Sequence, residues 1–116
     1  MEEIKMQDGI SFAVSTRTLT ARIGCEIDHH TARKMRDKID ERLFAVRPEL
    51  LVLDFSEVRF MDSSGLGLVL GRCERADSIG ARVRLVGLSS ALYKLVRLCG
   101  VERVKNLTVS AGESAC

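Results

Sequence analysis

The chain is 116 residues long, which suits one domain and leaves no room for a second. Its 18 basic and 16 acidic residues give a net charge of +2, and the two signs are interspersed, so the composition does not favour binding to DNA, RNA or a membrane surface. Trp is absent and aromatic residues make up only 4% of the chain, so the core must be aliphatic, and the stacking platforms that bind single-stranded nucleic acid are missing.

The first part of the chain predicts a strand pair followed by a helix. Apolar residues alternate with smaller or polar ones over 10–14, and after a short polar break a second apolar stretch follows at 19–23, which is typical of two antiparallel strands. The next apolar residues recur with helical spacing, at Ala32, Met35, Ile39 and Leu43. We expect Asp28 to cap the N-terminus of this helix and Pro48 to close it.

The middle of the chain predicts a buried strand that is followed by a second helix. Residues 50–55 form a nearly continuous apolar run, the pattern of a strand covered on both faces. Helical spacing then returns, at Leu66, Val69, Leu70 and Cys73. Asp62, Ser63 and Ser64 fall in the joint, where side-chain oxygens accept hydrogen bonds from the free N–H groups of the first helical turn. The sequence therefore predicts exposed hydroxyls in front of a buried helix.

Three glycines, Gly65, Gly67 and Gly71, lie in this predicted helix. Each weakens a helix by roughly 1 kcal/mol relative to Ala, so we expect a compensating close approach of the helix backbone to the sheet or to a docking partner. A helix N-terminus also carries about +0.5 elementary charge and outward N–H groups. A phosphate on Ser63 would thus be tolerated by the fold, while adding about −1.5 to −2 charge beside Asp62.

The last part of the chain predicts further alternation of strand and helix. Gly80 introduces a strand at 82–86, and a helix follows that either Ser89 or Ser90 caps. The apolar stripe of this helix is Leu92, Leu95, Val96 and Cys99, and Gly100 stops it. Residues 101–109 have room for a short last strand.

Together these elements predict an α/β fold with a mixed β-sheet, an N-terminal antiparallel strand pair and helices packed against the sheet. Right-handed crossovers place the N-termini of the later helices along one edge, where Asp28 and Ser63 can lie together. We expect a single domain over 1–109 and a flexible polar tail over 110–116.

Neither the cysteines nor the hydropathy indicates a cofactor, a metal site or a membrane span. The four cysteines show no C-x-x-C spacing, and Cys73 and Cys99 fall on helical stripes, so we expect both to be buried free thiols. No apolar stretch approaches the roughly 20 residues of a membrane span, and the start, MEEIK, is unlike a signal peptide. A cytoplasmic location follows.

Two segments resemble a known family. Residues 26–32, EIDHHTA, and 60–67, FMDSSGLG, with Leu70-Gly71-Arg72 following, resemble the two signature regions of the STAS-domain anti-sigma factor antagonists. The likeness extends to about Val104, and the Asp-His-His-Thr-Ala element favours the sporulation type.

The resemblance implies a non-enzymatic partner switch. Unphosphorylated members bind an anti-sigma factor that is also a serine kinase, and so release the sigma factor. The kinase phosphorylates the serine directly after the motif aspartate, here Ser63, and a serine phosphatase reverses the reaction. By the same resemblance, the candidate docking residues are Asp28, Met61, Asp62, Ser63, Ser64, Leu66, Gly67 and Arg72. Two of these residues have an alternative interpretation. Arg72 can equally be a solvated helix residue, and Ser64 can be a helix-capping residue.

The chain departs from the family pattern in two places. Cys25 stands where the family usually has Gly, so the chain there is expected to bend differently. The family commonly adds a final amphipathic helix, whereas here residues 106–110 lead only into a polar tail. Either that helix is dispensable or the sheet is covered differently.

Other functions compete with the partner switch. Ser63 with His29 or His30 and an aspartate supplies the ingredients of a nucleophile and base, but no G-x-S-x-G elbow accompanies them. The adjacent histidines point about 100° apart on a helix and lack a third metal ligand. A Gly-x-Gly at a helix start resembles a phosphate cradle without the G-K-[ST] ending of a P-loop. STAS domains also serve in stress signalling and in transporters.

Overall fold

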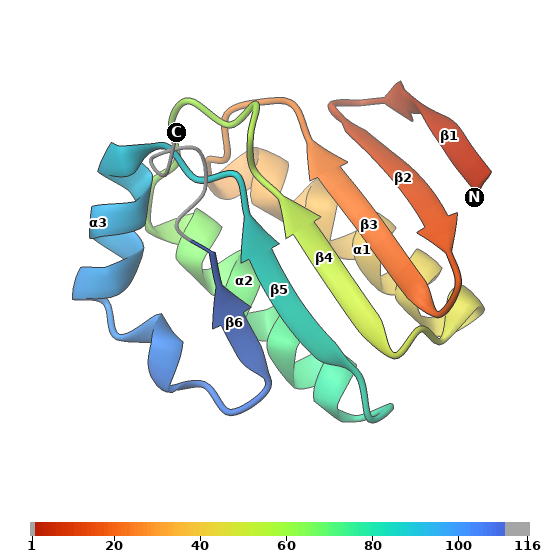
Figure 1. Ribbon diagram of the computed structural model, residues 1–116. Coiled ribbons are helices and arrows are strands. Elements are labelled where there is room, and N and C mark those ends of the chain that lie inside the picture. The colour runs from red at the N-terminus through yellow and green to blue at the C-terminus, as the bar shows by residue number, and fades with distance from the viewer. Residues whose placement is uncertain (1, 111–116) are drawn as a thin grey trace.

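A computed structural model shows one twisted sheet with helices packed against it (Figure 1). The structure describes residues 2–110, and the side chains of all of these except 2–7 and 102. In chain order the elements are β1 (Glu2–Gln7), β2 (Ile10–Ser15), β3 (Thr18–Ile23), α1 (His29–Val46), β4 (Leu50–Asp54), α2 (Ser63–Asp77), β5 (Arg82–Val86), α3 (Ser90–Leu98), the 3-10 turn η1 (Val101–Arg103) and β6 (Leu107–Val109).

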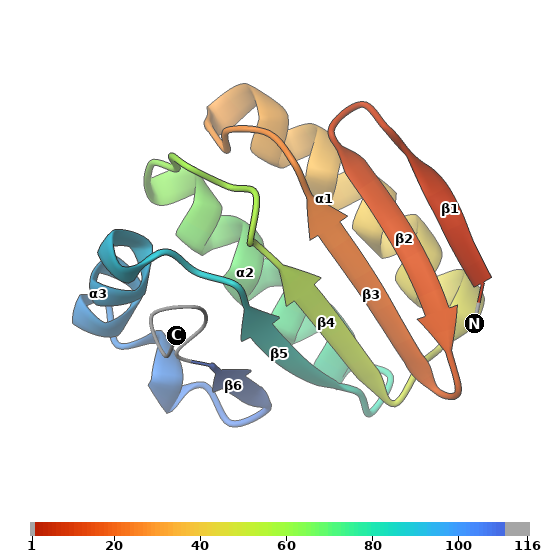
Figure 2. The same ribbon diagram turned by 45° about the horizontal axis from the view of Figure 1, so that its top comes forward.

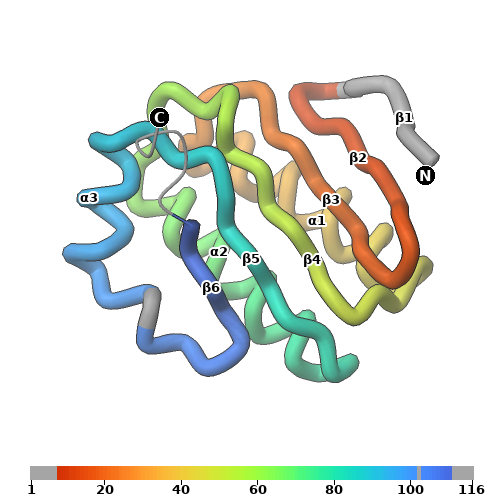
Figure 3. Tube along the Cα trace, viewed as in Figure 1, coloured from red at the N-terminus to blue at the C-terminus, as the bar shows by residue number. Residues whose placement is uncertain are grey.

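The strands lie side by side in the order in which they occur in the chain, β1 to β6. Figure 3 traces this order from β2 to β6. The pairs β1–β2 and β2–β3 are antiparallel, and the later pairs are parallel. Leu53 of β4, for example, lies between Ala21 of β3 and Leu85 of β5. The predicted mixed sheet with an antiparallel start is confirmed, and β6 supplies the short last strand.

Only one face of the sheet is covered by α1 and α2, which lie behind it in Figures 1 and 2. Leu51 and Leu53 face these helices and are fully buried, whereas Leu50 and Val52 on the opposite face are half-buried. The prediction that β4 is covered on both faces is therefore wrong. Successive right-handed crossovers that advance in one direction across a sheet place their helices on the same side, which leaves the other side open.

Strand β1 was not predicted, because its sequence, EEIKMQ, holds only two apolar residues and does not read as a strand by itself. Pairing with β2 at the edge of the sheet decides its structure. The expected tail at 110–116 lies outside the described residues, apart from Ser110, whose backbone N–H donates to the Leu85 carbonyl at 2.9 Å.

The helices end close to where the sequence predicts. Helix α1 ends at Val46, and Arg47 adopts a left-handed φ of 50° directly before Pro48. The cap of α3 is Ser89, whose hydroxyl oxygen accepts a hydrogen bond from the Leu92 N–H at 3.2 Å. Cys99 is exposed, so its expected burial is wrong: it is the C-cap that follows the last helical residue, and the last buried residue of the helix is Val96.

Helix α2 buries a face rotated from the predicted one. Its buried residues are Gly65, Leu68, Val69, Arg72, Cys73 and Ala76. Leu66 is only partly buried and Leu70 is 41% exposed, so the predicted stripe is correct for two of its four members. Nearly every position from 65 to 71 is apolar or glycine, so periodicity alone allows more than one face, and packing against α1 selects the one that carries Leu68 and Arg72.

Candidate functional site

The two segments that precede α1 and α2 meet at the carboxyl ends of the parallel strands. Ile27 and Met61 form an isolated parallel bridge, in which the Ile27 N–H donates to the Phe60 carbonyl at 3.0 Å and the Asp62 N–H donates to the Ile27 carbonyl at 3.1 Å. This bridge brings Asp28 beside the start of α2. The prediction that Asp28 and Ser63 share one edge of the sheet is confirmed.

The N-terminus of α1 is fixed by a reciprocal cap. The Asp28 carboxylate accepts from the Thr31 N–H at 2.9 Å, and the Asp28 N–H donates to the Thr31 hydroxyl oxygen at 2.8 Å. The Thr31 hydroxyl also donates to the Glu26 carbonyl at 2.8 Å. The hydrogen bond from the Thr31 N–H, followed by that from its hydroxyl, lowers the pKa of Asp28 from its ordinary value. Asp28 is therefore an exposed, ionised and rigidly held carboxylate.

The N-terminus of α2 is capped by Asp62, whose carboxylate accepts from the Ser64 N–H at 2.8 Å. Ser64 is thus a bonded first-turn residue, and its suggested capping role is wrong. Ser63 is the first residue of the helix and is exposed, and its hydroxyl forms no hydrogen bond with any described residue. The hydroxyl of Ser63 is accordingly free to react or to contact a partner.

Met61 and Gly65 pack against each other beneath this surface. Met61 is only 4% exposed, and a Cβ added to Gly65 would lie 2.5 Å from the Met61 Sδ and 3.0 Å from its Cβ. The close approach expected of the helix glycines is found at Gly65, although it is made to the segment before the helix. Gly67 and Gly71 differ, because a Cβ at either would meet nothing within 4 Å. Their open space faces outward.

Arg72 is the one charged residue of the described chain that is buried, with 3% of its surface exposed. Its Nε lies 2.9 Å from Oδ1 of Asp40 on α1, and Arg75 Nε lies 4.0 Å from the other oxygen of the same carboxylate. The suggestion that Arg72 is a solvated helix residue is wrong. As Arg72 and Met61 are both nearly buried, they shape the predicted docking surface and offer a partner little area.

A groove of about 350 Å³ runs between α1 and α2 and opens beside Ser64. Basic side chains line it, namely His29, Arg33, Arg36 and Arg72, together with Ala32, Ser64, Gly67, Leu68 and Gly71. We call it the α1–α2 groove. Gly67 and Gly71 leave two positions of the α2 wall without a side chain, between Ser64, Leu68 and Arg72. Of the predicted docking residues, Ser64, Gly67 and Arg72 line this groove.

Sequence reasoning did not identify Arg33, Arg36 or Asp40 as parts of the site. A signal was present, because Ala32, Arg36 and Asp40 recur every four residues beside the apolar stripe of α1 and so form a row on one side of the helix. That row faces α2. The sequence does not indicate which helix it would face, because that depends on the sheet.

Cys25, at the position of the family's usual glycine, fits without a left-handed backbone. Its thiol packs on Gly9, where an added Cβ would lie 2.9 Å from the sulfur. Burial, then the charges of Asp28 and Glu26, raises the pKa of this thiol. The neighbouring Asp28 cap is complete, with both hydrogen bonds of the capping box formed.

The enzyme and metal-site alternatives depend on the two adjacent histidines. His29 and His30 are exposed first-turn residues, and neither is hydrogen-bonded to Ser63. Among the side chains that the structure describes, no group of three or more from His, Cys, Asp or Glu is placed to hold a metal ion. No helix within residues 2–110 is long and apolar enough to span a membrane.

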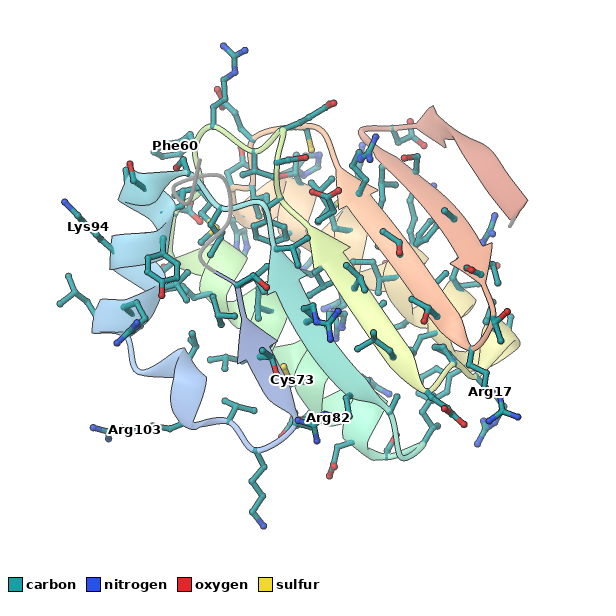
Figure 4. All side chains as sticks on the ribbon, in the orientation of Figure 1. Arg17, Phe60, Cys73, Arg82, Lys94 and Arg103 are labelled. Atoms are coloured by element: carbon teal, nitrogen blue, oxygen red, sulfur yellow. The ribbon has the colours of Figure 1, made fainter. Side chains whose placement is uncertain are left out.

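The aromatic ring of Phe60 adds an apolar element to this end of the sheet, where Figure 4 places it, with 53% of its surface exposed. Its backbone is held by the bridge to Ile27. An exposed aromatic residue on a rigid backbone is typical of the anchors that protein partners bind.

Residues 9–113 match the model of the STAS domain family. An anti-sigma F factor antagonist from Paenibacillus polymyxa is 31% identical over 86 residues, covering 74% of either chain. An anti-sigma-B factor antagonist from Listeria monocytogenes is 29% identical over 89 residues, covering 76% of either chain. The solved structure of the Bacillus cell fate determinant SpoIIAA in its phosphorylated form superimposes with a TM-score of 0.66 at 29% identity, covering 91% of this chain and 95% of that one.

Proposed function

This chain belongs to the STAS domain family, and from that premise we propose that it is an anti-sigma factor antagonist whose binding is switched by phosphorylation of Ser63. The observation that carries the proposal is the placement of Ser63. It is exposed, its hydroxyl is unengaged within the described chain, and it follows the Asp62 cap in a surface made of two helix N-termini. The named relatives support the class of partner.

A phosphate at this position alters docking without disturbing the fold. The N-terminus of α2 accommodates an anion, because its first N–H groups and its dipole favour negative charge. The same phosphate adds about −1.5 to −2 charge beside Asp62 and Asp28 in a surface that must lose water when a partner binds. A penalty of about 3 kcal/mol weakens binding more than a hundredfold.

The docking surface that we propose consists of the exposed and half-exposed residues around Ser63. These are Asp28, Asp62, Ser63, Ser64, Leu66 and Gly67, while Met61 and Arg72 hold them in position from below. The open space at Gly67 supports this assignment. A Cβ added there would meet nothing within 4 Å in its own chain, so the close approach of another chain explains why this helix position is a glycine.

The partner that we propose is an anti-sigma factor with serine kinase activity, and a serine phosphatase would restore the free hydroxyl. The chain itself then acts by binding and not as an enzyme. We assign it to the sporulation branch on the Asp28-His29-His30 element, and the stress-signalling branch is the alternative, since the Listeria relative acts on an anti-sigma-B factor.

The test is phosphorylation of the purified protein. The chain would be mixed with ATP and the anti-sigma F factor of Paenibacillus polymyxa, and phosphate would be mapped by mass spectrometry. Ser64→Ala is the matched control for Ser63→Ala, because the two serines are neighbours in the same helical turn. We expect phosphate on Ser63 in the wild type and in Ser64→Ala, and none in Ser63→Ala. Phosphate on Ser64, or an unmodified chain beside a kinase active on its own substrate, would contradict the assignment.

A further inference from the structure

The α1–α2 groove carries more positive charge than its neighbours neutralise. Arg33 forms no ion pair with any described residue. Arg36 Nε lies 3.1 Å from Asp37 Oδ1, but both side chains are about half-exposed or more, and a contact of this kind is weak in water. Asp37 does not line the groove, and the lining includes no acidic side chain.

The deepest cation of the groove is also incompletely satisfied. Arg72 contacts Asp40 through Nε, yet neither Arg72 Nε nor Asp40 Oδ1 has a hydrogen bond of good geometry within the described chain. Burial lowers the pKa of the Arg72 guanidinium; Asp40 opposes this shift, and the nearby charges of Arg75 and Arg36 add to it. The partly buried Asp40 carboxylate therefore contacts two guanidinium groups, those of Arg72 and Arg75.

The groove adjoins Ser63, because the next residue, Ser64, lines its wall, so a partner that extends from Ser63 toward α1 covers it. Burying an uncompensated charge in an interface is strongly unfavourable, whereas a matched anion converts it into a charge-assisted hydrogen bond. The partner must therefore either supply negative charge here or bind weakly.

We propose that the α1–α2 groove receives an acidic segment of the anti-sigma factor, whose carboxylates pair with the exposed Arg33 and Arg36 above the buried floor residue Arg72. The inference rests on the proposed function and deepens it by naming the chemistry of the partner. A protein segment fits better than a free anion, because Arg33 and Arg36 are exposed at the rim and the open space beside Gly67 and Gly71 admits a polypeptide backbone.

The same arrangement gives the phosphate a second effect. A phosphoryl group on Ser63 lies one residue from the groove wall at Ser64, and there it competes with the partner's carboxylates for the same guanidinium groups. Phosphorylation then weakens binding both by repulsion and by neutralising the groove.

Charge reversal at the rim tests the proposal. Arg33→Glu and Arg36→Glu change exposed side chains, and Lys34→Glu on the same helix is the matched control, because it makes the same change of net charge outside the groove. Binding of the unphosphorylated chain to the Paenibacillus polymyxa anti-sigma F factor would be measured by calorimetry in 50 and 300 mM NaCl. We expect each groove variant to lose at least about tenfold in affinity at low salt, and the control less than about threefold.

A second experiment tests the groove without the anti-sigma factor. Amide shifts of the isolated chain would be followed by NMR during titration with a tetraglutamate peptide, with inorganic phosphate and ATP as competing anions. We expect saturable peptide shifts at Ser64, Gly67 and Gly71 that Arg33→Glu and Arg36→Glu abolish and Lys34→Glu keeps.

The outcomes separate the two claims. If the peptide binds in the groove but the anti-sigma factor does not bind the chain, the proposed partner is wrong, and the proposal that the groove binds an acidic segment stands. Binding to the anti-sigma factor that the groove variants and the control weaken equally would overturn the groove proposal and retain the function. Saturable binding of phosphate or ATP without a response to the peptide would identify a free-anion site and also overturn it.

Discussion

Arg72 of α2 and Asp40 of α1 join the two helices through a contact of 2.9 Å between Nε and Oδ1, with the arginine side chain 4% and the aspartate side chain 19% exposed. Since buried pairs are stabilising only relative to a broken pair, this contact matters most when one partner is removed.

Asp40→Leu should destabilise the protein by about 3 kcal/mol, because it leaves the Arg72 guanidinium buried without its carboxylate. The double variant Asp40→Leu, Arg72→Met should recover most of the loss, as the two side chains then pack as apolar groups. Urea unfolding followed by circular dichroism measures both. Strictly additive losses in the double variant would show that the two residues are not coupled.

Alanine at Gly65 and at Gly67 should have opposite effects on stability. Gly65→Ala forces a Cβ against the buried Met61, so we expect a loss of about 1–3 kcal/mol from overpacking. Gly67→Ala should stabilise the helix by up to about 1 kcal/mol, because its Cβ meets nothing. The unfolding temperatures of the two variants, measured in parallel, test this prediction. A higher unfolding temperature in both variants would contradict the close contact between Gly65 and Met61. If the docking surface is as proposed, Gly67→Ala also binds the partner less tightly.

Replacing Ser63 by Asp should weaken partner binding without unfolding the protein, since a negative charge at the N-terminus of α2 is compatible with the helix. Ser63→Asn is the control, because it has the same size and no charge. We expect Asp to reduce affinity by about tenfold or more relative to Asn, less than a full phosphate does, with unfolding midpoints that agree closely. If Ser63→Asp and Ser63→Asn bind the partner equally tightly, the switch does not depend on charge.

The ionised Asp28 should stabilise the protein at neutral pH and lose this effect in acid. Its folded pKa lies below the ordinary value of 3.8, so its contribution is present above that value and disappears as the pH falls through the folded pKa. Asp28→Asn keeps a capping oxygen but does not titrate. The difference in unfolding free energy between wild type and Asp28→Asn should therefore be larger at pH 7 than at pH 2.5. A constant difference would mean that the cap does not depend on charge.

The cysteines should differ sharply in reactivity. Cys99 is exposed, whereas Cys73 is buried and burial raises its pKa to about 11, so few thiolates form at pH 8. With iodoacetamide and peptide mapping, Cys99 should be alkylated first and Cys73 only after unfolding in urea. Alkylation of Cys73 at a rate near that of Cys99 in the native protein would show that α2 detaches readily from the sheet.

Local signals in the sequence predicted the helix starts well, because a cap is made by residues within three positions of each other. Asp28, Asp62 and Ser89 each cap the helix that follows them. The pairing of Asp28 with Ser63 at one edge also followed from general rules of chain handedness.

Long-range contacts account for what the sequence did not predict. The buried face of α2 was ambiguous because every residue from 65 to 71 is glycine or apolar, and packing against α1 selects the face. The pair of Asp40 and Arg72 spans 32 positions, and no pattern within either helix links the two. The open second face of the sheet likewise depends on the direction of every crossover.

The chain-order arrangement of β1 to β6 has a consequence for how the protein is made. Each strand is added at the edge of those already formed, so no strand has to be inserted between two partners that are synthesised at different times. As the chain leaves the ribosome from its N-terminus, the sheet can grow in the same direction, and each crossover closes a loop between neighbours. We therefore expect assembly to be vectorial, with the surface around Ser63 complete only after β4 and α2 have emerged.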